Sequence, residues 1–121
     1  MKYFVDTYAI IEIIKGNEKY EKYVGEELCT TIYNLYELYY NLLREEGEEV
    51  AKNQFLRWKH IIISFTEQEI FQASRFKAQY KKRKLSYADA LGYAVAQAQS
   101  ILFLTGDQQF SDIKGVEFVK K

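Results

Sequence analysis

The chain has 121 residues, 48% of them hydrophobic, which is enough for one compact domain over residues 1–121. Its 17 basic residues balance 17 acidic ones, so its net charge does not favour a non-specific binder of polyanions. No apolar run approaches the roughly 20 residues of a membrane span, and no signal peptide precedes the first predicted strand. The single cysteine, Cys29, cannot form an internal disulfide, so we expect a cytoplasmic protein without membrane contact.

The hydrophobic pattern predicts strands that alternate with helices along the chain. The expected strands cover residues 2–6, 28–30, 60–65, 101–105 and 116–119. The expected helices cover residues 7–15, 18–24, 32–45, 48–58, 66–83 and 86–99. This alternation is typical of an α/β fold, in which a parallel central sheet is flanked by helices.

Charged side chains are scarce in three segments, residues 3–11, 28–43 and 85–111. Together these segments hold only four charges, and all of them are acidic: Asp6, Glu37, Asp89 and Asp107. Three of the four follow predicted strands or begin predicted helices, and those positions gather at one edge of a parallel sheet. We therefore expect these carboxylates to lie close together in space.

Each acid also has an ordinary structural explanation. Asp6 can cap the helix that follows its strand, and Asp107 belongs to a predicted turn. Asp89 completes an S-Y-A-D capping box that Ser86 opens. Glu37 lies opposite the expected apolar side of its helix, so periodicity alone places it in solvent. That apolar side consists of Ile32, Leu35, Tyr36, Tyr39, Leu42 and Leu43.

Carboxylates that crowd together in half-buried surroundings must either take up protons or bind a cation. No Lys or Arg accompanies the four acids within their segments, so a divalent ion is the simplest cation. A ring of carboxylates with few His or Cys ligands favours Mg²⁺ or Mn²⁺ over zinc. Such an ion lowers the pKa of a bound water and stabilises charge on a phosphate. The pattern therefore predicts metal-dependent hydrolysis of phosphodiester bonds.

An ordered set of motifs runs along nearly the whole chain: Asp6-Thr7 after a strand, a helical Glu37, L-S-x-x-D-A-L around Asp89, and T-G-D ending at Asp107. This set resembles the PIN-domain nucleases, and the chain length is most similar to the VapC toxins of bacterial and archaeal toxin–antitoxin pairs. The resemblance implies that the four acids bind Mg²⁺ or Mn²⁺ and cleave RNA. It also implies a homodimer and a cognate antitoxin protein whose tail covers the site.

Five neighbouring residues qualify this expectation. Thr7 and Thr105 could orient carboxylates in a metal site, or could serve only in turns. Tyr8 stands where the family often has Asn or Ser, and Gln109 stands where many members have a further Asp. These departures weaken the case for a second metal, and Asp112 could either replace the missing acid or face solvent. They leave a second hypothesis open: a catalytically degenerate PIN-like module that binds RNA or a protein partner without cleavage.

Two further segments are interpreted less directly. The run Lys81–Lys84 could bind the phosphate backbone beside Asp89, or could simply complement the dipole at a helix C-terminus. The helices over residues 32–45 and 48–58 could form an oligomer interface, with Tyr40 and Trp58 as its anchors.

Overall fold

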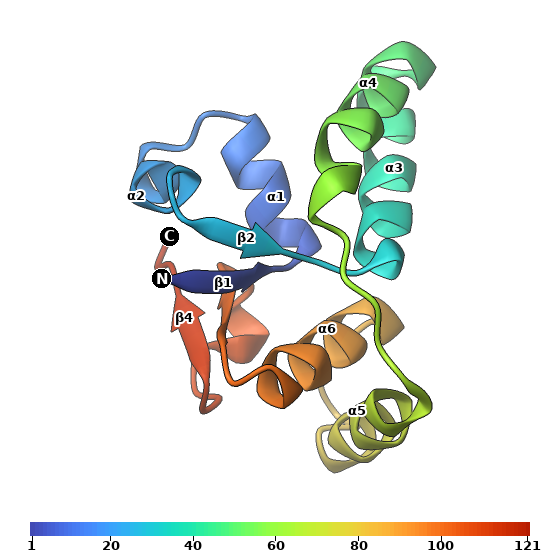
Figure 1. The fold of residues 1–121 in the computed structure, drawn as a ribbon, viewed down its shortest axis with the longest axis vertical. Helices are drawn as coiled ribbons and strands as arrows, with labels where there is room; N and C mark the ends of the chain where they lie inside the picture. The colour runs from blue at the N-terminus through green and yellow to red at the C-terminus, as the bar shows by residue number, and fades with distance from the viewer.

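The computed structural model describes all residues from 1 to 121, and its centre is a parallel sheet with the strand order β2-β1-β3-β4 (Figure 1). The four strands are β1 (Lys2–Val5), β2 (Glu27–Cys29), β3 (Leu102–Thr105) and β4 (Val116–Phe118). In the register, Phe4 of β1 lies beside Cys29 of β2 and Phe103 of β3. The predicted α/β fold with a parallel central sheet flanked by helices is confirmed.

Six α-helices and three short 3-10 helices connect and flank the strands. The α-helices are α1 (Thr7–Ile14), α2 (Glu21–Val24), α3 (Ile32–Glu46), α4 (Glu48–Trp58), α5 (Glu67–Gln79) and α6 (Tyr87–Ala98). The 3-10 helices are η1 (Glu18–Tyr20), η2 (Lys59–Ile61) and η3 (Gln108–Phe110). None of the helices is both long enough and apolar enough to span a bilayer.

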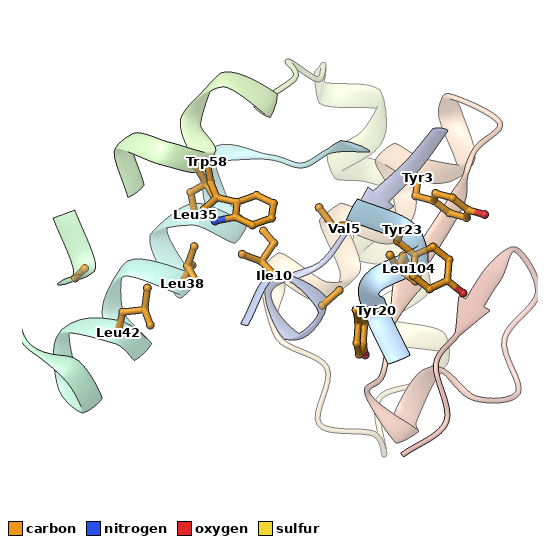
Figure 2. Packing of buried hydrophobic residues seen from close by; sticks show 12 residues of the cluster. Tyr3, Val5, Ile10, Tyr20, Tyr23, Leu35, Leu38, Leu42, Trp58 and Leu104 are labelled. Atoms are coloured by element: carbon orange, nitrogen blue, oxygen red, sulfur yellow. The ribbon is translucent and has the colours of Figure 1, made fainter. Parts of the chain in front are cut away.

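Alternating side chains on the central strands build two separate cores, one on each face of the sheet. Tyr3, Val5 and Leu104 pack on the face that α1, α3 and α4 cover (Figure 2). Phe4 and Phe103 point to the opposite face, where their rings stack with centroids 5.6 Å apart beneath α6. A side chain at Gly92 of α6 would collide with both rings, so glycine lets this helix approach the sheet closely.

The strand predicted over residues 60–65 is wrong. Residues Lys59–Ile61 form η2, and Ile62 makes only an isolated bridge to Thr30. Residues 59–61 continue directly from α4 as η2, so the run is extended only from Ile62 onward and makes a single bridge. Ile61 and Ile62 contact the first core, whereas Ile63 and Phe65 contact the second. The run thus joins the α3–α4 layer to the α5–α6 layer without adding a strand.

The helix predicted over residues 66–83 ends earlier, at Gln79. Its start is as predicted, with Thr66 as the N-cap of a complete capping box. At the other end, Arg83 donates to both carboxylate oxygens of Asp112, at 2.8 and 3.0 Å, and to the carbonyl of Gln109 at 2.7 Å. The basic run Lys81–Lys84 therefore follows the C-cap of α5, Tyr80, instead of forming the last turn of the helix.

Helix α3 is rotated relative to the stripe expected from the sequence. Its buried residues are Asn34, Leu35, Leu38 and Leu42, while Tyr36 is 71% exposed. Apolar residues occur on more than one side of α3, so the apolar pattern alone did not identify the side that faces α1 and α4. The rotation brings Glu37 into a half-buried position instead of the solvent position that periodicity predicted.

Trp58 cannot be the interface anchor that the sequence analysis expected. Figure 2 shows it beside Leu35, with its indole directed toward Ile10, and the residue is 7% exposed. Its indole N–H donates to Gln54 at 3.2 Å. Trp58 therefore holds α4 to the first core, whereas Tyr40 remains 55% exposed.

The two-core description predicts a large difference between two leucine truncations. Leu35→Ala should lower the free energy of unfolding by about 2–5 kcal/mol, because Leu35 is completely buried in the first core. Leu56→Ala is the matched control, since Leu56 is 58% exposed on α4, and should change stability by no more than about 0.5 kcal/mol. Urea unfolding of both variants measures this; equal losses would contradict the assignment of the core.

Candidate active site

Asp6 lies at the carboxyl end of β1 and is almost completely buried. It is the N-cap of α1, because its Oδ1 accepts a hydrogen bond from the backbone N–H of Ala9 at 2.8 Å. Its Oδ2 accepts from the hydroxyl of Thr105 at 2.5 Å. Burial raises the pKa of Asp6 well above its ordinary value, repulsion from Asp89 and Asp107 adds to this rise, and the two hydrogen bonds oppose it.

Asp107 reaches the same edge of the sheet from β3. Thr105 ends that strand, and its hydroxyl oxygen accepts from the backbone N–H of Asp107 at 3.0 Å while the hydroxyl donates to Asp6. Asp107 in turn caps η3 by accepting from the N–H of Gln109 at 3.1 Å. Thr105 therefore joins the two acids and holds the ends of the two central strands together.

Asp89 comes from the first turn of α6, where its Oδ2 accepts from the N–H of Ser86 at 2.9 Å in a reciprocal capping box. Burial raises the pKa of Asp89 to about 6, and repulsion from Glu37 and Asp107 contributes. Glu37 comes from α3, is half-buried and accepts no hydrogen bond.

The structure thus gathers the four predicted acids at one edge of the sheet, with Asp89 electrostatically coupled to the other three. None of the four forms an ion pair with a Lys, Arg or His side chain. As they stand, no three acidic, His or Cys side chains are close enough to hold a metal ion. The donors are chemically suited to a hard cation, but closing a ligand shell around one requires their side chains to move.

The other residues singled out from the sequence have different positions. The hydroxyl of Thr7 donates to the carbonyl of Asn34 at 3.2 Å and forms no hydrogen bond with any of the four carboxylates. Asp112 is exposed and paired with Arg83, which lowers the pKa of Asp112 below its ordinary value. Gln109 donates to the carbonyl of Lys84 at 3.1 Å and so fixes the basic run rather than extending the acidic cluster.

Two buried polar residues of the site were missed by the sequence analysis. Asn34 donates to Thr7 at 3.4 Å and accepts from Thr31 at 2.7 Å, which fixes α3 against α1 one turn before Glu37. The hydroxyl of Tyr20 is buried without a hydrogen-bond partner. A Cβ at Gly106 would collide with this hydroxyl and with the ring of Tyr8. The absence of a side chain at Gly106 therefore leaves room for both tyrosines to pack against the T-G-D turn. The spacing Thr31-x-x-Asn34 at the start of α3 could have indicated the role of Asn34, whereas no sequence pattern indicated the burial of Tyr20.

Comparisons with known proteins agree with this geometry. The PIN domain family matches residues 3–116. Among solved structures, Mycobacterium tuberculosis VapC20, described as a Sarcin-Ricin loop cleaving toxin, is 20% identical, with 98% of this chain and 99% of that one covered and a TM-score of 0.78.

A toxin–antitoxin complex from Klebsiella pneumoniae contains a chain that is 17% identical, with 98% of both chains covered and a TM-score of 0.75. VapBC2 from Rickettsia felis, bound to a promoter DNA fragment, has a chain that is 19% identical, with 96% of both covered and a TM-score of 0.73. Among curated proteins, no sequence matches this chain. At such low sequence identities, these structural matches establish similarity of fold alone. The family is established by the match over residues 3–116: the chain belongs to the PIN domain family.

Proposed function

We propose that this chain is a Mg²⁺- or Mn²⁺-dependent ribonuclease that hydrolyses RNA phosphodiester bonds, and that it is the toxin of a VapBC-type toxin–antitoxin pair. One observation carries the proposal. Four carboxylates from four separate elements converge at the sheet edge. Burial, with repulsion among the acids adding to it, raises the pKa of Asp6 and Asp89, and no basic side chain forms an ion pair with any of the four. A protein rarely retains such an arrangement for stability alone, since burying unpaired charge costs free energy.

Asp6, Glu37, Asp89 and Asp107 are the residues that would hold the divalent ion. When bound, the ion would supply an activated water and stabilise negative charge on the phosphate undergoing hydrolysis. Thr105 acts on the site indirectly, because its hydrogen bond fixes one oxygen of Asp6 while the N–H of Ala9 fixes the other. The capping box of Ser86 holds Asp89 in the same way and leaves its Oδ1 without a hydrogen bond.

The relatives in known structure support an antitoxin partner and RNA as the substrate. Two of the similar structures are toxin–antitoxin complexes, and VapC20 is described as cleaving the Sarcin-Ricin loop. A homodimer that uses exposed aromatic residues such as Tyr40 belongs to the same proposal, as does a cytoplasmic location, which the buried free thiol of Cys29 favours.

The basic run Lys81–Lys84 remains a hypothesis for binding the phosphate backbone. Its alternative as a cationic cluster at a helix C-terminus also stays open, because the run begins directly after Tyr80, the C-cap of α5. Arg83 is committed to Asp112, whereas Lys81, Lys82 and Lys84 form no ion pair. Gln109 holds this run beside η3, which begins directly after Asp107.

A catalytically degenerate PIN-like module is the second candidate. Two observations favour it: Gln109 is engaged with the carbonyl of Lys84, and no three side chains stand at metal-binding distance. Asp112 does not replace the missing acid, since it is paired with Arg83. This candidate would bind RNA or a protein partner without cleavage.

The nuclease proposal predicts that Asp6→Asn, Asp89→Asn and Asp107→Asn each reduce RNA cleavage on the order of 100-fold or more, because each removes one anionic ligand. The assay is cleavage of a panel of structured RNAs with Mn²⁺, with circular dichroism to establish folding. Asp112→Asn is the matched control, and its activity should stay within about threefold because it lies in an exposed ion pair. Undiminished cleavage in all three site variants would end the proposal; no cleavage by the folded wild-type chain would favour the degenerate module.

Asp89 gives a pH prediction for the metal-free protein. Its folded-state pKa of about 6 lies above its ordinary value of 3.8, so the folded protein binds the proton more tightly than the unfolded chain does. Stability from this group is therefore greatest at low pH and is lost as the pH rises from about 4 to about 6. In EDTA, Asp89→Asn should match wild type near pH 4 and exceed its stability by about 2–3 kcal/mol at pH 7. If the wild type instead became more stable relative to the variant as the pH rises, the predicted direction of the Asp89 pKa shift would be contradicted.

A further inference from the structure

A pocket of about 540 Å³ adjoins the acidic cluster on the α1 side. Its walls come from α1, from the turn through η1 and from the residues that follow β4. Four of its ten lining residues are lysines, and only one is acidic. The lysines are Lys15, Lys19, Lys120 and Lys121, and the acid is Glu12.

Few of the lysine charges of this pocket are paired, although Lys19 and Lys120 also line a neighbouring pocket that contains Glu18, Glu21 and Glu117. Nζ of Lys15 lies 4.0 Å from Glu12, at the limit of an ion pair. Nζ of Lys19 donates to the backbone carbonyl of Lys120 at 3.1 Å, which brings two cationic residues together without a carboxylate between them. Lys120 and Lys121 form no ion pair. An anion bound in the pocket would reduce this repulsion.

Tyr8 connects the lysine pocket to the acidic cluster. Its side chain lines the pocket and is 37% exposed. The same ring packs against Gly106, which directly precedes Asp107, and Tyr8 itself is two residues after Asp6. None of the four acids lines the pocket, and Tyr8 is the residue that connects it to Asp6 and Asp107.

We propose that the lysine pocket binds a backbone phosphate of the RNA strand whose neighbouring phosphodiester lies at the carboxylates, an inference that rests on the proposed nuclease function. A strand that crosses four carboxylates is repelled by them, so its adjacent phosphates need positive charge nearby. The pocket supplies that charge at the rim of the acidic edge. Tyr8 and Val119 give it an apolar wall suited to a sugar or an unstacked base.

The test compares two charge-matched double variants. Lys15→Gln with Lys120→Gln removes two pocket lysines, whereas Lys59→Gln with Lys114→Gln removes two exposed lysines elsewhere. Lys114 and Lys120 are well matched, since they are exposed residues that lie two positions before and two after β4. Binding of a fluorescein-labelled, mixed-sequence 12-nucleotide single-stranded RNA is measured by anisotropy in EDTA, so that neither metal nor cleavage is required.

The pocket variant should bind the RNA about five- to tenfold more weakly, and its plot of log affinity against log salt concentration should be shallower by about 1 to 1.5. The control variant should stay within about twofold of wild type. Equal weakening of both variants, or of neither, would overturn the proposal. So would a loss of affinity for an oligo-glutamate peptide without a loss for RNA, because the pocket would then be a site for an acidic protein segment.

The proposed function and this pocket fail in different ways. If the pocket lysines control RNA binding but wild type cleaves no RNA with Mn²⁺, the pocket is supported and the nuclease proposal fails. If wild type cleaves and the pocket variant keeps both its RNA affinity and its salt dependence, the nuclease proposal stands and the pocket is overturned. Thermal melting of both variants establishes folding, which exposed Lys→Gln changes should leave nearly unaltered.

Discussion

The hydrogen bond from Thr105 to Asp6 is the contact on which the rest of the site depends. It joins the carboxyl ends of the two central strands, and the other oxygen of Asp6 simultaneously begins α1. Because Thr105 also receives the N–H of Asp107, one threonine sets the position of two acids. The carboxylate of Asp6, at the centre of this network, is almost inaccessible to solvent and has no cationic partner from the protein. Ionising it without a bound cation therefore costs free energy.

Capping and clustering are not alternative explanations for the acids, although the sequence presents them as such. Asp6, Asp89 and Asp107 each accept a backbone N–H at the start of a helix, and the same three repel one another across the sheet edge. A helix N-terminus carries partial positive charge and fixes the carboxylate that caps it. Capping therefore lowers the cost of placing negative charge here and orients the side chains toward a common space. The lysine pocket beyond Tyr8 places the opposite charge next to this space.

Features with a local cause could be predicted from the sequence, and those set by tertiary packing could not. The capping boxes at Thr66 and Ser86 and the strands that flank Asp6 and Asp107 follow from short-range residue patterns. The strand predicted over residues 60–65 is wrong because its first residues continue α4 as η2, which the apolar run did not indicate. The half-buried position of Glu37 depends on which side of α3 is buried, and that is set by the packing of Leu35, Leu38 and Leu42 in the first core together with the contacts of Asn34. No pattern in the sequence pointed to the buried hydroxyl of Tyr20.

The most direct measurement for this account is anomalous scattering from a crystal soaked in Mn²⁺. The account predicts a peak enclosed by the carboxylates of Asp6, Glu37, Asp89 and Asp107, with Glu37 rotated inward to complete the ligand shell. It would be contradicted by a saturating soak that leaves this space without a peak while the four carboxylates keep the separations they have now, because the acids would then gather for a reason other than binding a cation.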